Sequence, residues 1–330
     1  MNYSCIDRGS SRCPCSLMEA GQCYTCGMTD KGKCSCPSGE KWTGVCPYNE
    51  FVLNGNSGAK IREPWDAKVI KYRRYSDLLA VIRLETQRGF AQKCSKPGAY
   101  IMAESMDFYI PISILDTMVY GESHIDIAIQ PAGPKTKALI SRIERDISQY
   151  PDKPAPKLTL RIKGPFFSGL QNVQLLNEWK MDILRNKKYL VVGKGTAIAP
   201  MINCLKYLDG EKGNFMNDEK NVQLIIDTDK LNAEFLQDYL GPKLMEKACI
   251  LSLYKDMAKV IDMGENADYI LFLASPYYTS IFLSMDPYIK ERTISANHAN
   301  ICCGIGLCGS CSYVDDSGTT VKKCKCISEA

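Results

Sequence analysis

One segment decides the fold of this chain: residues 188–200, which read KYLVVGKGTAIAP. Its first part is a short run of apolar and β-branched residues, which is typical of a buried strand. The glycines Gly193 and Gly195 follow, and the stretch after them, to about Leu208, favours a helix. A strand, a glycine turn and a helix in this order predict one unit of a parallel α/β sheet.

The segments that follow repeat this alternation of strands and helices. Strands are predicted over residues 221–227, 248–254 and 269–274, and a second helix over residues 231–239. Consecutive strands that are separated by helices lie parallel in one sheet. We therefore expect an α/β domain over residues 166–295.

Residues 61–165 have a different pattern. Short alternating or β-branched runs are separated by turn signals, at residues 80–84, 109–115, 124–129 and 158–162. This spacing predicts an antiparallel barrel or sandwich. One helix, over about residues 135–147, interrupts the strands.

The two ends of the chain are small and rich in cysteine. Residues 1–60 have few apolar runs, so we expect bound metal to hold this extension together. The sequence NGNSG at residues 54–58 predicts the linker that ends it. Residues 296–330 form a compact tail of cysteines and glycines. The expected fold class is multidomain, with a β-barrel, a parallel-sheet α/β domain and two small modules.

Bulk composition excludes several classes of protein. The 330 residues carry a formal charge of only +4 and show no basic run interleaved with aromatics, so we expect no nucleic-acid partner. No stretch approaches the roughly 20 apolar residues that span a bilayer, and the first residues lack the pattern of a signal peptide. These features predict a soluble, cytoplasmic protein without a membrane partner. Its 17 cysteines then favour metal ligation over disulfides.

The C-terminal cysteines have the most specific spacing in the chain. Cys303, Cys308 and Cys311 form a C-x4-C-x2-C pattern, and Cys324 follows at a distance. This is the plant-type spacing for a [2Fe–2S] cluster, and the glycines between the cysteines let backbone amides approach the sulfurs. A structural zinc site is the alternative, because zinc also takes four thiolates.

The N-terminal cysteines allow two further four-coordinate sites. The inner six have the symmetric spacing C-x-C, seven residues, C-x2-C, seven residues, C-x-C. Their thiolates can bind iron–sulfur clusters or zinc, and the spacing does not decide the grouping. The eight residues are Cys5, Cys13, Cys15, Cys23, Cys26, Cys34, Cys36 and Cys46.

Three short segments are candidates for binding nucleotide phosphates. In the turn after the first strand, glycines allow phosphate to reach a helix N-terminus, although many such turns use glycine for steric reasons alone. Residues 133–136 open the helix of the barrel section and could face a pyrophosphate, or could simply cap the helix. Asp227 and Asp229 end the next strand and could meet a ribose hydroxyl, or could be turn residues.

From about residue 63 to the end, the chain resembles the ferredoxin–NADP reductase superfamily. Residues 110–113, IPIS, look like its Arg-Pro-x-Ser flavin motif, and residues 191–200 resemble its Val-Gly-Gly-Gly-x-Gly-x-Ala-Pro turn. Residues 96–102 are similar to its Pro-Gly-Gln-Phe strand, residues 129–139 to its Gly-x-Gly-Thr segment, and residues 163–169 to its Gly-Pro-x-Gly turn. The nearest pattern is the electron-transfer subunit of type B dihydroorotate dehydrogenase. The small subunit of NADH-dependent ferredoxin:NADP oxidoreductase and the sulfhydrogenase gamma subunit are also similar.

The resemblance implies an FAD on the barrel, NAD(P) at the α/β domain and a [2Fe–2S] cluster that leads to a partner. It implies an oxidoreductase subunit in a hetero-oligomer with a larger flavoprotein or iron–sulfur catalytic subunit. The implied flavin-binding residues are Pro111, Ile112, Ser113, Gly133, Lys135 and Thr136, and the implied nucleotide-binding residues are Gly193, Gly195, Thr196, Ala197 and Pro200.

Three positions depart from the family pattern. Ile110 replaces the motif arginine, Ala197 replaces the third glycine of the turn, and Ser275 and Pro276 stand where the family has Cys-Gly-Pro. The departures keep a second hypothesis open: a non-catalytic assembly subunit that retains the reductase fold and metal sites without binding nucleotide.

Overall fold

The computed structural model describes residues 2–5, 64–149, 158–182, 187–209, 221–228, 231–297, 301, 310–314, 320–322 and 326–329. The chain divides into two compact units. One is the continuous segment Trp65–His298, and the other combines Met1–Pro64 with Ala299–Ala330.

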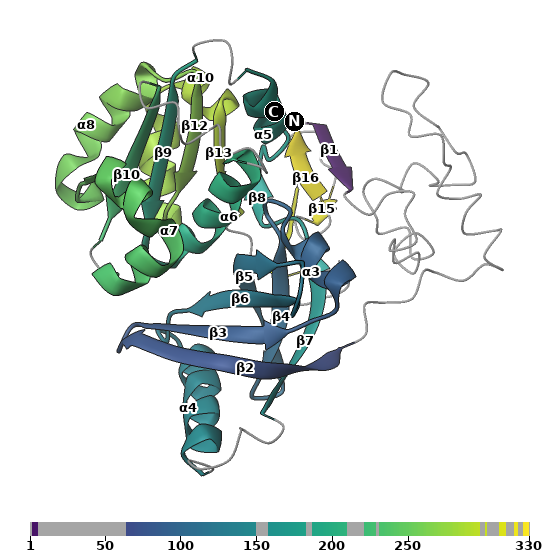
Figure 1. The fold of residues 1–330 in the computed structure, drawn as a ribbon. Helices are drawn as coiled ribbons and strands as arrows, with labels where there is room; N and C mark the ends of the chain where they lie inside the picture. The colour runs from purple at the N-terminus through teal and green to yellow at the C-terminus, as the bar shows by residue number, and fades with distance from the viewer. Residues whose placement is uncertain are drawn as a thin grey trace, which may run out of the picture. The chain divides into compact units, whose positions relative to one another are not determined.

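The first part of the larger unit is a closed antiparallel barrel (Figure 1). Its strands follow one another around the barrel in the order β2-β3-β6-β5-β4-β7. Of the two architectures predicted for this section, the barrel is the one that forms. Its strands are β2 (Trp65–Ser76), β3 (Leu79–Glu85), β4 (Tyr100–Ser105), β5 (Phe108–Met118), β6 (His124–Ile129) and β7 (Thr159–Phe166).

Alternation of side chains along the strands builds the core of the barrel. On β5, Ile110, Ile112 and Ile114 are buried in this core, since residues two apart in a strand point to the same side. Two helices cover the barrel: α3 (Arg88–Cys94) and α4 (Pro134–Ser148). The predicted helix over residues 135–147 is therefore confirmed as α4.

The second part of the larger unit is a six-stranded sheet in the order β11-β10-β9-β12-β13-β8. Every neighbouring pair is parallel except β13 with β8, which confirms the predicted α/β sheet. The strands are β8 (Leu170–Gln171), β9 (Tyr189–Lys194), β10 (Val222–Asp227), β11 (Ala248–Ile250), β12 (Tyr269–Leu273) and β13 (Thr293–Ala296).

Helices cover both faces of this sheet. Val191 of β9 packs toward α5 (Leu175–Asp182), α6 (Ile198–Asp209) and α7 (Ala233–Lys247). Leu190 and Val192 of the same strand pack toward α8 (Leu253–Glu265), α9 (Pro276–Ser284) and α10 (Pro287–Glu291). Burial on both faces explains the continuous apolar run that predicted β9.

One predicted strand is shorter than expected. The strand expected over residues 248–254 ends at Ile250, and Leu253 and Tyr254 begin α8. The backbone N–H of Leu253 donates to the Asp227 carboxylate at 2.7 Å, and that of Ser252 donates to Asp256 at 3.0 Å. These side-chain acceptors bind the backbone N–H groups at the start of α8, so the chain forms a helix here although the apolar pattern of the sequence continues.

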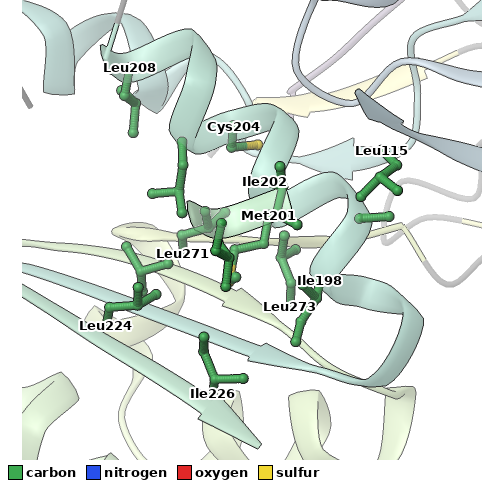
Figure 2. Close-up of a cluster of buried hydrophobic side chains, with 14 of the residues drawn as sticks. Leu115, Ile198, Met201, Ile202, Cys204, Leu208, Leu224, Ile226, Leu271 and Leu273 are labelled. Carbon is green, nitrogen blue, oxygen red and sulfur yellow. The ribbon is translucent and has the colours of Figure 1, made fainter. Parts of the chain in front are cut away.

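One of the apolar clusters contains residues of both the barrel and the sheet domain. Leu115 of β5 and Val81 of β3 belong to the same buried cluster as Ile198 and Met201 of α6. Figure 2 shows this cluster, in which side chains of α6 lie among those of β10 and β12 and Leu115 of β5. The helix that follows the glycine turn is therefore packed directly against the barrel.

The smaller unit pairs the two ends of the chain. Strand β1 (Asn2–Cys5) runs antiparallel to β16 (Cys326–Glu329), with Asn2 opposite Glu329 and Cys5 opposite Cys326. Strands β14 (Ser312–Val314) and β15 (Thr320–Lys322) form a second antiparallel pair. Among the described residues, no helix is long and apolar enough to cross a membrane.

Candidate cofactor sites

The predicted flavin motif lies in the middle of β5 and presents alternate residues to the two sides of the barrel wall. Pro111 is exposed and Ser113 is half-buried on the outer side. Ile112 is 6% exposed in the barrel core, as is Ile110 at 9%. A ligand on the outer surface can therefore meet the side chains of Pro111 and Ser113, but only the backbone of Ile112.

The neighbouring strands continue this outer side of the barrel wall, where Met102 of β4 is fully buried and Lys163 of β7 is half-buried. Pro111 lies opposite Met102 of β4, which in turn lies opposite Lys163 of β7, so the three residues share one face. The Lys163 ammonium is 4.2 Å from the centre of the Tyr109 ring, the preceding outward position on β5. A cation and an aromatic ring thus stand beside the motif, although Ile110 supplies neither.

Sequence reasoning did not include Lys163 and its neighbour Arg161 among the candidate site residues. Both face outward on β7, and Arg161 also forms an ion pair with Asp66 at 3.4 Å. The signal was present in the sequence, because basic residues alternate with Leu160 and Ile162 at the period of a half-buried strand. Only the strand order shows that this basic row is close to β5.

Hydrogen bonds of the turn after β7 connect the barrel to the end of β13 in the sheet. The N–H of Gly169 donates to the Gly98 carbonyl at 3.0 Å, and an added Cβ on Gly169 would lie 2.6 Å from that oxygen. The Asn297 side chain, just beyond β13, donates to the Ser168 carbonyl at 2.7 Å. Ser168 Oγ in turn lies 3.3 Å from the Tyr100 hydroxyl on β4.

The second predicted flavin segment forms the N-terminus of α4. Gly133 is the N-cap, and Thr136 Oγ1 lies 3.1 Å from both the N–H and the carbonyl oxygen of Gly133. The Lys135 ammonium lies 4.4 Å from the centre of the exposed Phe108 ring at the start of β5. Ser105 Oγ donates to the Lys135 carbonyl at 2.7 Å, which fixes the first turn of α4 against β4.

The predicted nucleotide turn lies at the carboxyl end of β9. Gly193 is packed so closely that an added Cβ would lie 2.5 Å from the Met201 sulfur. Gly195 has a φ of +61° and open space where a side chain would be. Thr196 and Ala197 are half-buried in the single 3-10 turn that follows, and Pro200 is buried in the first turn of α6, where proline costs no helical hydrogen bond.

Between the two glycines, Lys194 forms an ion pair across the carboxyl edge of the sheet. Its ammonium lies 2.7 Å from Asp227 Oδ2, and the two side chains are 14% and 2% exposed. The same ammonium lies 5.3 Å from the centre of the Tyr278 ring in α9. Of the two predicted ribose-contacting residues, Asp227 is therefore at the edge where ligands bind such sheets, and Asp229 lies outside the described residues.

The fold brings two of the predicted segments together. Helix α6, which begins after the glycine turn, packs on β5, the strand of the flavin motif. Lys206 of α6 forms an ion pair with Asp116 of β5 at 2.6 Å. A ligand on the outer face of β5 and a ligand at the carboxyl edge of the sheet would therefore be bound by two elements that contact each other.

Most of the predicted metal ligands lie outside the described residues. Of the C-terminal set, Cys311 is described and is 6% exposed, whereas Cys303, Cys308 and Cys324 are outside. Of the N-terminal set, only the backbone of Cys5 is described, in β1. Within the described ranges, no group of three or more His, Cys, Asp or Glu side chains could hold a metal ion.

No protein-family model matches this sequence, and no curated protein matches it. Among solved structures, the NADH-dependent reduced ferredoxin–NADP oxidoreductase studied for flavin-based electron bifurcation is similar over 78% of this chain and 85% of its own, with 14% identity and a TM-score of 0.50. The fold is that of a ferredoxin–NADP reductase. The reductase from Plasmodium falciparum covers 70% of this chain and 95% of its own at 14% identity, with a TM-score of 0.45.

A third solved structure, the ferredoxin reductase in carbazole 1,9a-dioxygenase, covers 72% of this chain and 68% of its own at 14% identity, with a TM-score of 0.47. The first of these likenesses, at a TM-score of 0.50 and 14% identity, shows a shared fold and not a shared activity. The barrel and the parallel sheet of this chain are therefore the two domains of the reductase fold. The finer resemblance, to the electron-transfer subunit of type B dihydroorotate dehydrogenase, stays a prediction.

Proposed function

We propose that this chain is the electron-transfer subunit of an oxidoreductase complex. It passes electrons between NAD(P)H or a partner's flavin, its own FAD and a [2Fe–2S] cluster, and then to a partner protein. The observation that carries the proposal is the packing of α6, which follows the nucleotide turn, on β5, which carries the flavin motif. This contact puts two candidate cofactor sites on adjoining elements, as hydride exchange between two cofactors requires.

The outer face of the barrel fits a flavin phosphate chemically. Lys163 and Arg161 supply the positive charge that the motif position Ile110 lacks, and the first turn of α4 supplies backbone N–H groups beside Thr136. Pro111 and Ser113 would meet the flavin with their side chains. A bound flavin would supply the exchange between a two-electron hydride and one-electron carriers.

The carboxyl edge of the sheet fits a pyridine nucleotide. The turn at Gly195 leaves room above the backbone at the start of α6, where a helix N-terminus favours phosphate. Ser275 is exposed at the N-cap of α9, after β12, and Pro276 follows it. These two residues occupy the position where the family has Cys-Gly-Pro, so they adjoin the same edge.

The cysteine-rich ends complete the proposed electron path. We assign the [2Fe–2S] cluster to Cys303, Cys308, Cys311 and Cys324 on their spacing. The eight N-terminal cysteines hold further iron–sulfur or zinc. The acceptor is a larger flavoprotein or iron–sulfur subunit, and the proposed location is the cytoplasm.

The second candidate function is that of a non-catalytic assembly subunit. The inward direction of Ile110 and the Ser275-Pro276 sequence favour it, since both change positions that meet cofactors in the resembled family. In that case the chain keeps the fold and metal sites but binds no nucleotide. Cofactor content separates the two candidates.

The deciding experiment is to measure flavin, iron, acid-labile sulfide and zinc in protein purified without oxygen. We expect bound FAD and a [2Fe–2S] electron paramagnetic resonance signal after reduction. Cys308→Ser should abolish that signal while FAD content is unchanged, and Cys249→Ser, an exposed cysteine of β11, is the matched control. Colourless protein with stoichiometric zinc would leave only the assembly function.

A further inference from the structure

A polar pocket of about 210 Å³ lies between the wall of the barrel and α7. Pockets for drug-sized ligands have roughly 300–1,000 Å³, so this one fits a smaller molecule. None of the residues predicted to bind flavin or nucleotide is among its described lining residues. Basic and acidic side chains line it in equal number: Lys71, Arg73 and Arg83, and Asp116, Asp126 and Asp238.

The basic side chains of the pocket come from neighbouring positions of the barrel. Lys71 of β2 lies opposite Arg83 of β3, and Arg73 is two residues further along β2, so the three share one face of the wall. A guanidinium has five N–H donors, and Asp126 accepts from only Nε and Nη2 of Arg83. Neither Arg83 Nη1 nor the Lys71 ammonium donates to a described residue. Donors for a carboxylate are therefore left over at this end of the pocket.

The side of the pocket that α7 forms has the opposite excess. Asp238 Oδ2 accepts hydrogen bonds from both Arg73, at 2.7 Å, and the Tyr75 hydroxyl, at 2.5 Å. Asp238 Oδ1 accepts from no residue in the described part of the chain. Arg73 also pairs with Glu234 of α7, so two carboxylates share one arginine. A carboxylate oxygen and uncompensated negative charge thus remain for a cationic group.

A ligand that carries both charges suits this arrangement. A simple anion would meet the three carboxylates of the lining, and a simple cation would meet Lys71 and the two arginines. A zwitterion pairs with both ends and leaves the net charge of the pocket unchanged. Lys71 and Arg73 are about 7 Å apart along β2, and Asp238 is bound to Arg73, so the two charges of the ligand must be close together.

We propose that this pocket binds a small α-amino acid, with the ligand carboxylate on Lys71 and Arg83 and the ligand ammonium on Asp238 Oδ1. The bound molecule joins β2 and β3 of the barrel to α7 of the sheet domain. Because it binds the folded chain, its presence stabilises that chain against unfolding. The inference does not depend on the proposed electron-transfer function, since none of the three residues is assigned to a cofactor.

Calorimetric titration of the full chain, purified without oxygen, tests the ligand class at one fixed ionic strength. The probes are glycine, L-serine and L-glutamine, together with two fragments of serine: 3-hydroxypropionate, which lacks the ammonium, and ethanolamine, which lacks the carboxylate. At least one of the amino acids should bind and raise the temperature of thermal unfolding. Each fragment should bind roughly tenfold or more weakly than L-serine, because hydrogen bonds between charged groups are lost.

Variants of the two ends test the residue roles. Lys71→Met should weaken binding of the amino acid by roughly tenfold or more, and Lys71→Arg should keep most of the affinity. Asp238→Asn should weaken the amino acid but not 3-hydroxypropionate. The matched control is Lys68→Met, which removes another exposed lysine of β2 that does not line the pocket.

Three results would overturn the inference. The first is that none of the three amino acids binds the wild-type chain. The second is that Lys71→Met binds the amino acid as tightly as wild type does. The third is that 3-hydroxypropionate binds as tightly as L-serine, since the pocket would then be a site for simple anions.

Discussion

Asp126 shows how a single buried residue links the two domains of the larger unit. Its carboxylate is 1% exposed and accepts two hydrogen bonds from Arg83, at 2.7 and 2.8 Å. The Tyr239 hydroxyl of α7 donates to the same carboxylate at 3.0 Å. The hydrogen bonds from Arg83 to Asp126, together with the negative charge of that carboxylate, raise the pKa of the Arg83 guanidinium. Asp126 thus joins β6 and β3 of the barrel to a helix of the sheet domain.

At the residue scale, Asp126→Ala should lower the free energy of unfolding by about 3 kcal/mol, because it leaves a half-buried guanidinium without its partner. Urea unfolding followed by tryptophan fluorescence measures this, since Trp179 is fully buried. The control is Glu85→Ala, which breaks an exposed pair with Lys68 at 3.7 Å. That change should cost less than about 1 kcal/mol. Equal losses in the two variants would contradict the assigned role of Asp126.

The strand–turn–helix element owes its shape to two glycines that are required for different reasons. Gly193 has no room for a side chain, because an added Cβ would lie 2.9 Å from Ile198 Cγ1 and closer still to Met201. Gly195 has room but adopts the left-handed backbone conformation, at a φ of +61°. One glycine therefore lets α6 pack closely on β9, and the other lets the chain turn into it.

At the element scale, Gly193→Ala should destabilise the protein by about 1–3 kcal/mol through overpacking. The double variant Gly193→Ala with Met201→Ala tests the reason, because shortening Met201 removes the clash. The destabilisation by Gly193→Ala should therefore be smaller when measured in the Met201→Ala background. The urea midpoints of wild type, the two single variants and the double variant provide this comparison. An unchanged effect in both backgrounds would rule out Met201 as the cause.

Gly195→Ala makes a contrasting prediction on the same element. The strain of a left-handed alanine is about 1 kcal/mol, and no neighbouring atom can relieve it. The loss should therefore be the same with or without Met201→Ala. Relief of the Gly195→Ala loss by Met201→Ala, measured in the same unfolding series, would show that packing and not backbone conformation determines this position.

At the scale of the larger unit, two tyrosine hydroxyls donate hydrogen bonds between the barrel and α7, one from each side. Tyr75 of β2 donates to Asp238 of α7 at 2.5 Å, whereas Tyr239 of α7 donates to Asp126 of β6. They line a polar pocket of about 210 Å³ between the barrel and this helix. Burial and the adjacent carboxylates raise the pKa of both phenols above their ordinary value of 10.0. The neutral hydroxyls therefore stabilise this contact.

These raised pKa values predict a pH dependence with a definite sign. A phenol whose pKa is higher in the folded state contributes stability below its unfolded pKa, and that contribution is lost as the pH rises further. Between about pH 10 and 12, the wild-type urea midpoint should fall more steeply than that of the double variant Tyr75→Phe, Tyr239→Phe. The control is Tyr254→Phe, because Tyr254 is 80% exposed. Parallel pH profiles for wild type and the double variant would refute this account of the contact.

Local patterns in the sequence were sufficient to predict the two main domains. The apolar run of β9, the glycine turn and the alternation on β5 depend on neighbours within a few residues of each other. Such periodicity is decided by backbone geometry, so it can be read without knowing the fold. The short strands β8 and β13 were missed because two to four residues carry too little periodicity.

The sequence by itself thus determined a barrel, a parallel α/β sheet and a cysteine spacing typical of a metal centre. The tertiary structure alone decided which side chains meet. It placed Lys163 of β7 near the predicted flavin motif, and it placed Lys194 on Asp227, 33 residues away. The reason is physical: periodicity along one strand specifies the face of a side chain, but its partners depend on the strand order and register of the whole sheet.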